Sequence, residues 1–295
     1  MHVVNRPPTS IQLEPVLGCN MRCDFCPTCR LPTNEPLKFM SVAMTDSIGM
    51  EIAHLTSQGR HLRLDLALRG EPTLHPDLPL VIQLLRRHLP YCQMTIVTNG
   101  ARLSIQMVEA LFAQGLNFIY LDCYGNSYGK WSKFFADGDF YVRNSAHITH
   151  WKWHGYKKQC LILGHNILGE QKSTRKLVSF CKALPKKNCM KYGIPWIESP
   201  LEKRCADPFR SINITCNGNV LLCCRDWDER RVMMTIGQDR ADLTDYWYHD
   251  EYLNFLRFRL YQRDRGFEPC DNCDYNGGVY LGNLPKPEGE GINDY

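Results

Sequence analysis

The sequence predicts an α/β protein built on a parallel sheet, followed by a small cysteine-rich domain. Two observations carry this prediction. Strand-like and helix-like segments alternate through the first two thirds of the 295 residues, and the 15 cysteines include two spaced groups that flank this region. A hydrophobic content of 44% and an aromatic content of 11% are sufficient for a core, which excludes a disordered chain.

The alternation is the primary evidence for the fold class. The expected strands are 11–17, 62–68, 94–98, 117–122, 159–164 and 189–194, and the expected helices between them are 41–58, 77–88, 104–113 and 171–183. Strands that alternate with helices favour parallel pairing through right-handed crossovers. A further helix is expected over 243–262, and the Pro- and Gly-containing tail 284–295 is expected to be flexible.

The first cysteine group directly follows the first strand. Cys19, Cys23 and Cys26 have the spacing C-x3-C-x2-C. A tight loop with this spacing can bring three thiolates to one iron–sulfur cluster and leave one iron open. An open iron can bind a cofactor or substrate directly.

With Phe25 between its last two cysteines, this loop resembles the cluster motif of the radical S-adenosylmethionine (SAM) superfamily. Gly70-Glu71-Pro72 after strand 62–68 is similar to the family's Gly-Gly-Glu-Pro element, which holds the SAM amino group, although Arg69 replaces the first glycine. Polar residues also end the next two strands. On this resemblance, the residues expected to bind SAM are Phe25, Gly70, Glu71, Pro72, Asn99 and Asp122.

The resemblance implies a partial (β/α)6 TIM-like barrel over 1–196, with its chemistry at the carboxyl ends of the strands. It also implies reductive cleavage of SAM to a 5′-deoxyadenosyl radical, which abstracts hydrogen from the substrate. A flavodoxin- or ferredoxin-type protein is the implied electron donor.

The second cysteine group resembles the opening of the SPASM domain, in a truncated, twitch-like form. Cys205 and Cys223 fit the pattern C-x12-G-x4-C, and Cys270-x2-Cys273 follows. We expect these four to bind one auxiliary [4Fe–4S] cluster in a domain spanning 197–283. Because adjacent strand residues point to opposite faces, only one of Cys223 and Cys224 is expected to be a ligand. The spacing favours Cys223, which leaves Cys224 as a structural thiol or a hydrogen-atom donor.

An alternative of another class is a zinc-dependent nucleic-acid-binding protein without catalysis. Cys23-x2-Cys26 and Cys270-x2-Cys273 have zinc-ribbon spacing. This alternative does not explain Gly-Glu-Pro and Asn-Gly at successive strand ends. The absence of a signal-peptide pattern and of apolar runs near 20 residues predicts a cytoplasmic, non-membrane protein, in which a disulfide scaffold is a poor explanation for the cysteines.

Charge distribution gives the expectation about the substrate. The formal net charge is +4, but segment 143–191 has eleven basic residues and a single acidic one. Cationic stretches with interleaved aromatic residues suit phosphates and stacked bases. This pattern favours a nucleic-acid base or nucleotide, for example a hypermodified DNA base. The candidate substrate residues are Arg143, Trp151, Lys152, Trp153, Lys157 and Lys158.

A radical SAM epimerase or dehydrogenase of a carbohydrate is the second alternative. The basic segment would repel a polycationic aminoglycoside, whereas a neutral or phosphorylated sugar is compatible with it. A peptide-modifying enzyme is the third alternative. It ranks below the others because such enzymes usually carry an N-terminal recognition domain, which we do not expect here.

Overall fold

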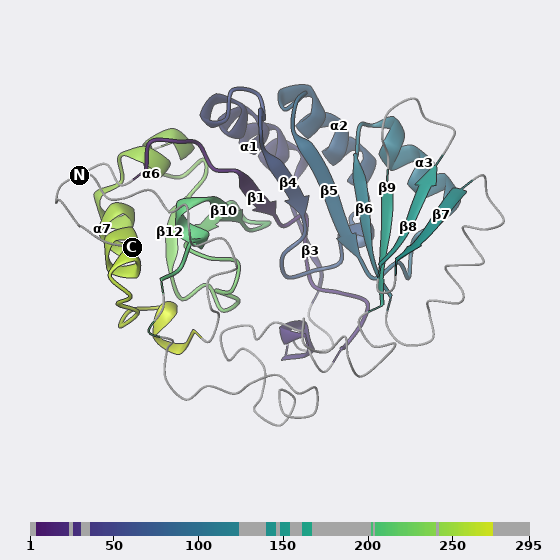
Figure 1. The fold of residues 1–295 in the computed structure, drawn as a ribbon. Helices are drawn as coiled ribbons and strands as arrows, with labels where there is room; N and C mark the ends of the chain where they lie inside the picture. Colours follow the sequence, from purple (N-terminus) through teal and green to yellow (C-terminus); the bar gives the residue numbers. More distant parts are fainter. Residues whose placement is uncertain are drawn as a thin grey trace.

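A computed structural model describes most of the two predicted regions (Figure 1). The described residues are 4–23, 26–30, 36–123, 140–145, 148–153, 161–166, 202, 204–239 and 242–273. For the three separate strand segments between 140 and 166, the description covers the backbone path. In the part of the chain that the structure describes, no helix is both long and apolar enough to cross a membrane.

The centre of the fold is a mostly parallel sheet, which confirms the predicted fold class. Five strands run parallel in the order β1 (Ser10–Leu13), β4 (Arg63–Leu66), β5 (Gln93–Thr98), β6 (Phe118–Cys123) and β9 (Leu161–Asn166). Their apolar side chains, such as Ile11, Leu64 and Ile96, are fully buried.

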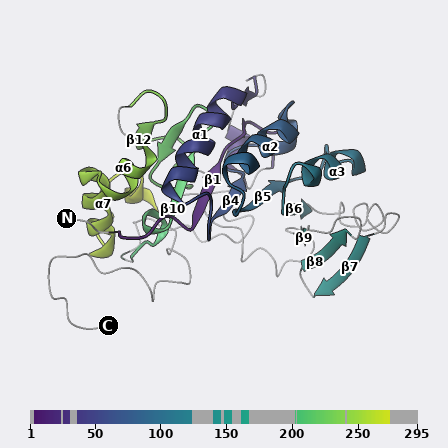
Figure 2. The same cartoon turned by 90° about the horizontal axis from the view of Figure 1, so that it is seen from above.

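Three helices follow the strands as expected: α1 (Val42–Leu55), α2 (Leu78–His88) and α3 (Ile105–Ala113). They lie along one face of the sheet (Figure 2). Ser41 and Ser104 begin α1 and α3 by accepting hydrogen bonds from the backbone N–H of Met44 and Met107. The helices bury their apolar side chains against the sheet and leave its carboxyl edge open to the loops.

The far edge of the sheet differs from the expectation. No strand is expected between 122 and 159, but the structure has two there, β7 (Phe140–Ser145) and β8 (Ile148–Trp153). These strands form an antiparallel hairpin, and β8 pairs antiparallel with β9. The helix expected at 171–183 and the strand expected at 189–194 lie outside the described residues.

Two expected elements are each divided in the structure. Strand 11–17 ends at Leu13, and after Glu14-Pro15 the short β2 (Val16–Leu17) pairs with β3 (Lys38–Phe39) instead of the main sheet. Helix 243–262 is two helices, α6 (Leu243–Tyr248) and α7 (Glu251–Tyr261). Asp250 separates them, because its backbone is extended and its side chain caps the start of α7.

The C-terminal strands extend the sheet at its other edge, beyond β1. β10 (Ser211–Ile214) pairs parallel with β1, and β11 (Asn219–Leu221) and β12 (Val232–Thr235) add antiparallel strands beyond it. Short 3-10 helices η4 (Asp207–Phe209) and η5 (Cys270–Asn272) lie next to cysteines. The second cysteine group is therefore attached directly to the first strand of the barrel.

Candidate active site and auxiliary cysteine site

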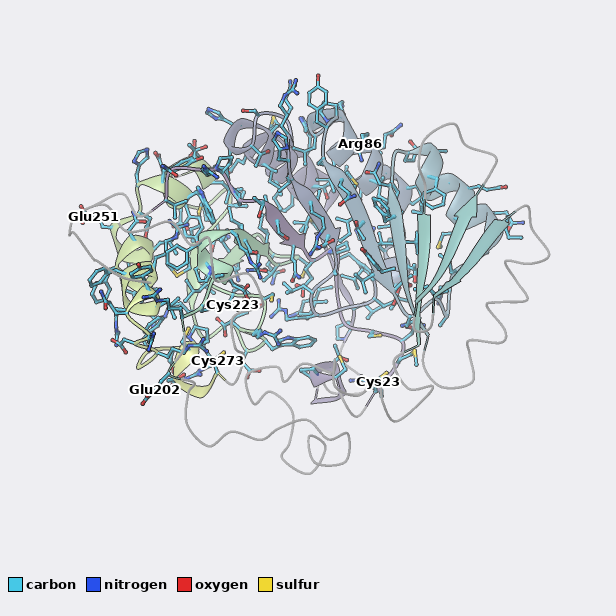
Figure 3. The ribbon with its side chains drawn as sticks, in the orientation of Figure 1. Cys23, Arg86, Glu202, Cys223, Glu251 and Cys273 are labelled. Atoms are coloured by element: carbon cyan, nitrogen blue, oxygen red, sulfur yellow. The ribbon has the colours of Figure 1, made fainter. Side chains whose placement is uncertain are left out.

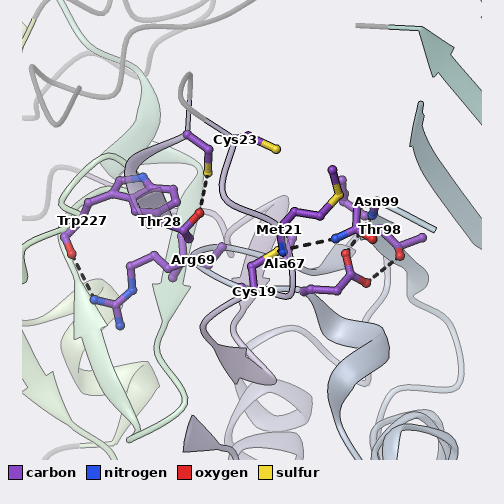
Figure 4. A pocket seen from close by; sticks show the side chains of 14 residues that line it. Cys19, Met21, Cys23, Thr28, Ala67, Arg69, Thr98, Asn99 and Trp227 are labelled. Atoms are coloured by element: carbon purple, nitrogen blue, oxygen red, sulfur yellow. Dashed lines mark hydrogen bonds between the residues drawn. The ribbon is translucent and has the colours of Figure 1, made fainter. Parts of the chain in front are cut away.

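The three thiols of the first group line one cavity of about 250 Å³ at the carboxyl ends of β4 and β5 (Figure 4). Cys19, Cys23 and Cys26 are half-buried. Nearby donors face their sulfur atoms: the Met21 N–H lies 3.3 Å from Cys19 Sγ, and the Thr28 hydroxyl lies 3.2 Å from Cys26 Sγ. Three thiols on one cavity wall, supported by hydrogen-bond donors, form a ligand set that fits a cluster with one open iron.

Burial is the main influence on the pKa of Cys19. It raises the pKa of the thiol, and so do the charges of Glu71 and Cys26, whereas hydrogen bonds from the Met21 backbone and Asn99 lower the pKa. A cationic cluster at this point would favour the thiolate and oppose the effect of burial. Phe25 lies outside the described residues.

Glu71 is the only expected SAM-binding carboxylate whose side chain is described. Its Oε1 accepts hydrogen bonds from the Thr73 N–H at 3.1 Å, the Thr73 hydroxyl and the Thr98 hydroxyl. Its Oε2 accepts one, from the Asn99 N–H at 2.8 Å. Since a carboxylate oxygen has two lone pairs, Oε2 retains acceptor capacity on a residue that lines the cavity. This arrangement fits an ammonium ligand.

Gly70 is required by the close approach of another backbone segment. An added Cβ would lie 2.0 Å from the Val16 carbonyl oxygen and 2.7 Å from that of Gly18. The Glu71 N–H donates to the same Gly18 carbonyl at 3.0 Å. Pro72 begins the short 3-10 helix η2 (Pro72–Leu74) and is buried; it is absent from the described cavity lining.

Asn99 connects the end of β5 to the cluster loop. Its side-chain amide lies 3.4 Å from Cys19 Sγ and 2.9 Å from Asn20 Oδ1. Asp122 occupies a β6 position opposite His165 of β9, and the description of it ends at the backbone. Glu71, Asn99 and the three cysteines are thus brought together by the structure.

Arg69, the departure from the family motif, forms a buried ion-pair network. Its guanidinium donates to both oxygens of Glu14, at 2.8 and 2.9 Å, and lies 2.7 Å from Glu229. It also donates to the Trp227 carbonyl at 3.2 Å. Burial lowers the pKa of Arg69, but Glu14 and Glu229 outweigh burial and hold it above its usual value. Arg69 therefore joins the barrel to the loop that follows β11.

The four cysteines expected at the auxiliary cluster are all buried. Cys205 precedes η4, Cys223 follows β11, Cys270 begins η5, and Cys273 directly follows η5. Figure 3 labels Cys223 and Cys273. Burial, followed by the charges of Cys205 and Cys273, raises the pKa of Cys270. Burial also raises the pKa of Cys205 to about 12, with a contribution from Asp207.

The buried Arg265 lowers the pKa of both Cys205 and Cys270. Cys273 raises the pKa of both thiols, and Cys205 raises that of Cys270, so these three sulfur atoms lie near one another. Buried thiols gathered in this way fit the ligand set of a cluster.

The rule that adjacent strand residues point to opposite faces does not apply to the two adjacent cysteines. Cys223 and Cys224 lie in the turn after β11, not in a strand. Their sulfur atoms and a carboxylate oxygen of Asp207 all lie within 4.8 Å of one another. A hydrogen bond with Cys223 is the main influence on Cys224 and lowers its pKa. Strand alternation therefore does not distinguish the two thiols.

Four of the expected substrate residues lie on the β7–β8 hairpin, for which the structure describes the backbone path, and their contact with a substrate stays a prediction. By register, Arg143 and Lys152 fall on one face of the β7–β8 hairpin, and Trp151 and Trp153 fall on the other. Lys157 and Lys158 lie outside the described residues. The described cavity lining comes from residues 19–28, 67–71, 97–99 and Trp227.

Sequence reasoning missed Trp227, Glu14 and the bridging role of Arg69. Glu14 could have been noticed as an acidic residue that directly follows an apolar strand. Trp227 gives no signal beyond its place shortly after Cys223 and Cys224.

Comparisons with known proteins match an iron–sulfur family to each of the two cysteine groups. Residues 13–125 match the model of the radical SAM superfamily, and residues 205–274 match the SPASM model, an iron–sulfur cluster-binding domain. The fold and the site define an iron–sulfur enzyme that uses SAM. The chain belongs to the radical SAM superfamily, with a SPASM-type C-terminal domain.

A relative from Niallia circulans, S-adenosyl-L-methionine-dependent 2-deoxy-scyllo-inosamine dehydrogenase, is 24% identical over 276 residues, which are 90% of this chain and 92% of the relative. The structure of BtrN in complex with AdoMet and 2-DOIA has a TM-score of 0.69 at 21% identity, and 92% of this chain and 95% of that one are covered. Streptococcus suis SuiB bound to precursor peptide SuiA has a TM-score of 0.54 at 14% identity, with 86% and 67% covered. These likenesses support the shared fold.

The family match settles the cofactor class. The enzyme uses SAM and [4Fe–4S] clusters, including an auxiliary cluster, and it needs a reductant. This outcome favours iron over the zinc alternative. The comparisons give no support to a nucleic-acid substrate or partner.

Proposed function

We propose that this enzyme is a SAM-dependent dehydrogenase that oxidises a hydroxyl-bearing carbon of a small ring compound, a cyclitol or a sugar. The observation that supports this most directly is similarity to a dehydrogenase of that kind over 92% of the relative's length. In this proposal a carbohydrate-like substrate, one of the alternatives given above, replaces the predicted nucleic-acid substrate. The cytoplasm remains the proposed location.

Cys19, Cys23 and Cys26 are the proposed ligands of the SAM-binding cluster. Glu71 would accept the SAM ammonium on Oε2, the carboxylate oxygen with remaining acceptor capacity. Asn99 would keep β5 against the cluster loop, and Gly70 and Pro72 would fix the turn that presents Glu71. Phe25 and Asp122 remain proposed SAM-side residues. Together, SAM and this cluster supply a 5′-deoxyadenosyl radical when reduced.

Cys205, Cys223, Cys270 and Cys273 are the proposed ligands of the auxiliary cluster. Oxidation of an alcohol to a ketone releases one electron more than hydrogen-atom abstraction alone, and a second iron–sulfur cluster in the chain is suited to one-electron chemistry. A flavodoxin- or ferredoxin-type protein is the proposed external donor.

An epimerase acting on a similar ring is the second candidate, because the half-buried Cys224 offers a thiol beside the auxiliary site. An epimerase must return a hydrogen atom, and a thiol is a suitable source. The products distinguish the two reactions, since oxidation lowers the substrate mass by two hydrogens and epimerisation leaves it unchanged.

The experiment uses reconstituted, anaerobic enzyme with a reductant and three ring compounds that carry deuterium on carbon. These are 2-deoxy-scyllo-inosamine, the uncharged scyllo-inositol and a phosphorylated inositol. We expect deuterium in 5′-deoxyadenosine and a ketone product, with the uncharged or phosphorylated ring preferred over the amine because of the basic segment 143–191. Deuterium transfer to 5′-deoxyadenosine, with a product in which a single hydrogen has replaced the deuterium on the ring carbon, would favour the epimerase. No transfer from any ring, together with transfer from a nucleoside or peptide, would overturn the proposal.

A further inference from the structure

Trp227 is the one residue of the described cavity lining that comes from the C-terminal domain. Every other lining residue belongs to the cluster loop or to the ends of β4 and β5, between Cys19 and Asn99. In Figure 4, the indole of Trp227 lies on the side of the cavity away from Thr98 and Asn99. The cavity therefore has one wall from the barrel and a facing wall that includes a single large aromatic side chain.

The lining residues between Cys19 and Asn99 already have proposed roles. Their three thiols fit the cluster, and Glu71 and Asn99 fit the SAM side of the cavity. Trp227 lies on the side of the cavity away from Asn99, beside Thr28 of the cluster loop. A ligand that packs on its indole would leave the Asn99 side of the cavity to SAM.

The position of Trp227 is fixed by its neighbours. Its carbonyl accepts a hydrogen bond from the buried Arg69 at 3.2 Å, and Arg69 also pairs with Glu229 two residues further along. The buried Asp226 accepts from the N–H groups of Arg230 and Arg231, at 2.9 and 2.8 Å, which closes the loop on itself. These bonds hold the backbone that carries the indole, which reduces the conformational entropy lost when a ligand packs on it.

We propose that Trp227 positions the substrate, with one face of its indole packed against the C–H face of the ring. This inference rests on the proposed function, because a saturated ring with hydroxyl groups at its edge presents such an apolar face. Small-molecule sites combine apolar or aromatic walls with a few polar groups in this way. The indole also excludes water from the carbon that loses hydrogen, which protects a reactive radical from side reactions.

The same loop connects this wall to the second cluster site. Cys223 and Cys224 precede Trp227 by four and three residues, and the Asp226 N–H donates to the Cys223 carbonyl at 3.1 Å. Cys223, Cys224 and Trp227 are therefore parts of one hydrogen-bonded turn.

The test compares the wild type with Trp227→Phe and Trp227→Ala, using whichever labelled ring the wild type oxidises. The control is Tyr252→Ala, which removes an exposed aromatic side chain of α7 outside the described cavity lining. We expect Trp227→Ala to raise KM by about tenfold or more and to increase the 5′-deoxyadenosine formed per ketone. Trp227→Phe should give intermediate values, and Tyr252→Ala should match the wild type.

Two further measurements separate positioning from structure. The iron content and the dissociation constant of SAM should stay within about twofold of the wild type in every variant. Unchanged KM and unchanged coupling in Trp227→Ala would overturn the proposal, and so would weakened SAM binding, which would place Trp227 at the cofactor. If the wild type forms no ketone from any ring, the proposed function fails, and the role assigned to Trp227 fails with it.

Discussion

At the scale of single residues, the main feature is a charge network that crosses the sheet. Glu14 is fully buried at the end of β1, and it accepts hydrogen bonds from the Arg69 side chain and backbone and from the Cys216 N–H. A buried carboxylate is tolerated only when its oxygens are paired and hydrogen-bonded. Arg69 stands where the family motif has glycine, so in this sequence that position carries a buried side chain that pairs with Glu14 and Glu229.

Arg69→Met should therefore destabilise the protein strongly. The substitution leaves Glu14 as an uncompensated buried charge, and we expect the free energy of unfolding to fall by about 3–5 kcal/mol. The measurement is denaturant unfolding of the reconstituted enzyme under anaerobic conditions.

The matched control is Arg87→Met in α2. Arg87 pairs with Asp46 at 2.6 Å, and the two side chains are 62% and 37% exposed. Loss of this exposed pair should lower the free energy of unfolding far less. Equal losses in the two variants would contradict a structural role for the buried network.

At the scale of elements, two loops define the cavity, and each is held by backbone contact with a neighbouring element. The cluster loop follows β2, and Gly18 at its start forms a bridge to Gly70 after β4. The turn after β11 places Cys223, Cys224 and Trp227 within a few residues. The site is thus assembled by loop-to-loop contacts at the open edge of the sheet.

Gly70→Ala tests the first of these contacts. The new methyl group would clash with the Val16 carbonyl, so the cluster loop must move. We expect iron content to fall by up to about four per chain, since one four-iron cluster is affected, and SAM binding to weaken by about tenfold or more. Iron analysis and SAM equilibrium dialysis measure the two effects.

Gly266→Ala is the control for that substitution. Its added Cβ would lie 3.3 Å from an Asp264 side-chain oxygen and 3.5 Å from an Arg259 side-chain nitrogen, both able to adjust. Iron content and SAM affinity should match the wild type. A Gly70→Ala enzyme with full iron and normal SAM affinity would show that the close approach is unimportant.

At the scale of the whole molecule, the predicted second domain shares the sheet and the core of the first. β10 pairs with β1 along its length, and buried side chains from both regions belong to one hydrophobic cluster. Arg69 links the two regions again at the cavity. Loss of structure at the auxiliary site should therefore affect the barrel as well.

Removal of the auxiliary cluster tests this coupling. We expect the wild type to hold about eight irons per chain and the double variant Cys270→Ala/Cys273→Ala to hold about four. Thermal unfolding should remain a single transition that moves to lower temperature, because metal binding contributes to folding free energy. Two separate transitions, with the barrel's midpoint unchanged, would show that the two regions fold independently.

The sequence by itself determined the chemistry-bearing parts of this protein. Cysteine spacing and the Gly-Glu-Pro turn are local patterns, so they can be read without knowledge of the fold, and strand–helix alternation predicts parallel pairing. Only the tertiary structure decided which distant residues meet. The pairing of β10 with β1, the burial of Glu14 against Arg69, and the presence of Trp227 and Glu71 in one cavity lining all join residues far apart in the chain. Their physical basis is non-local packing, which leaves no periodic mark in a single sequence.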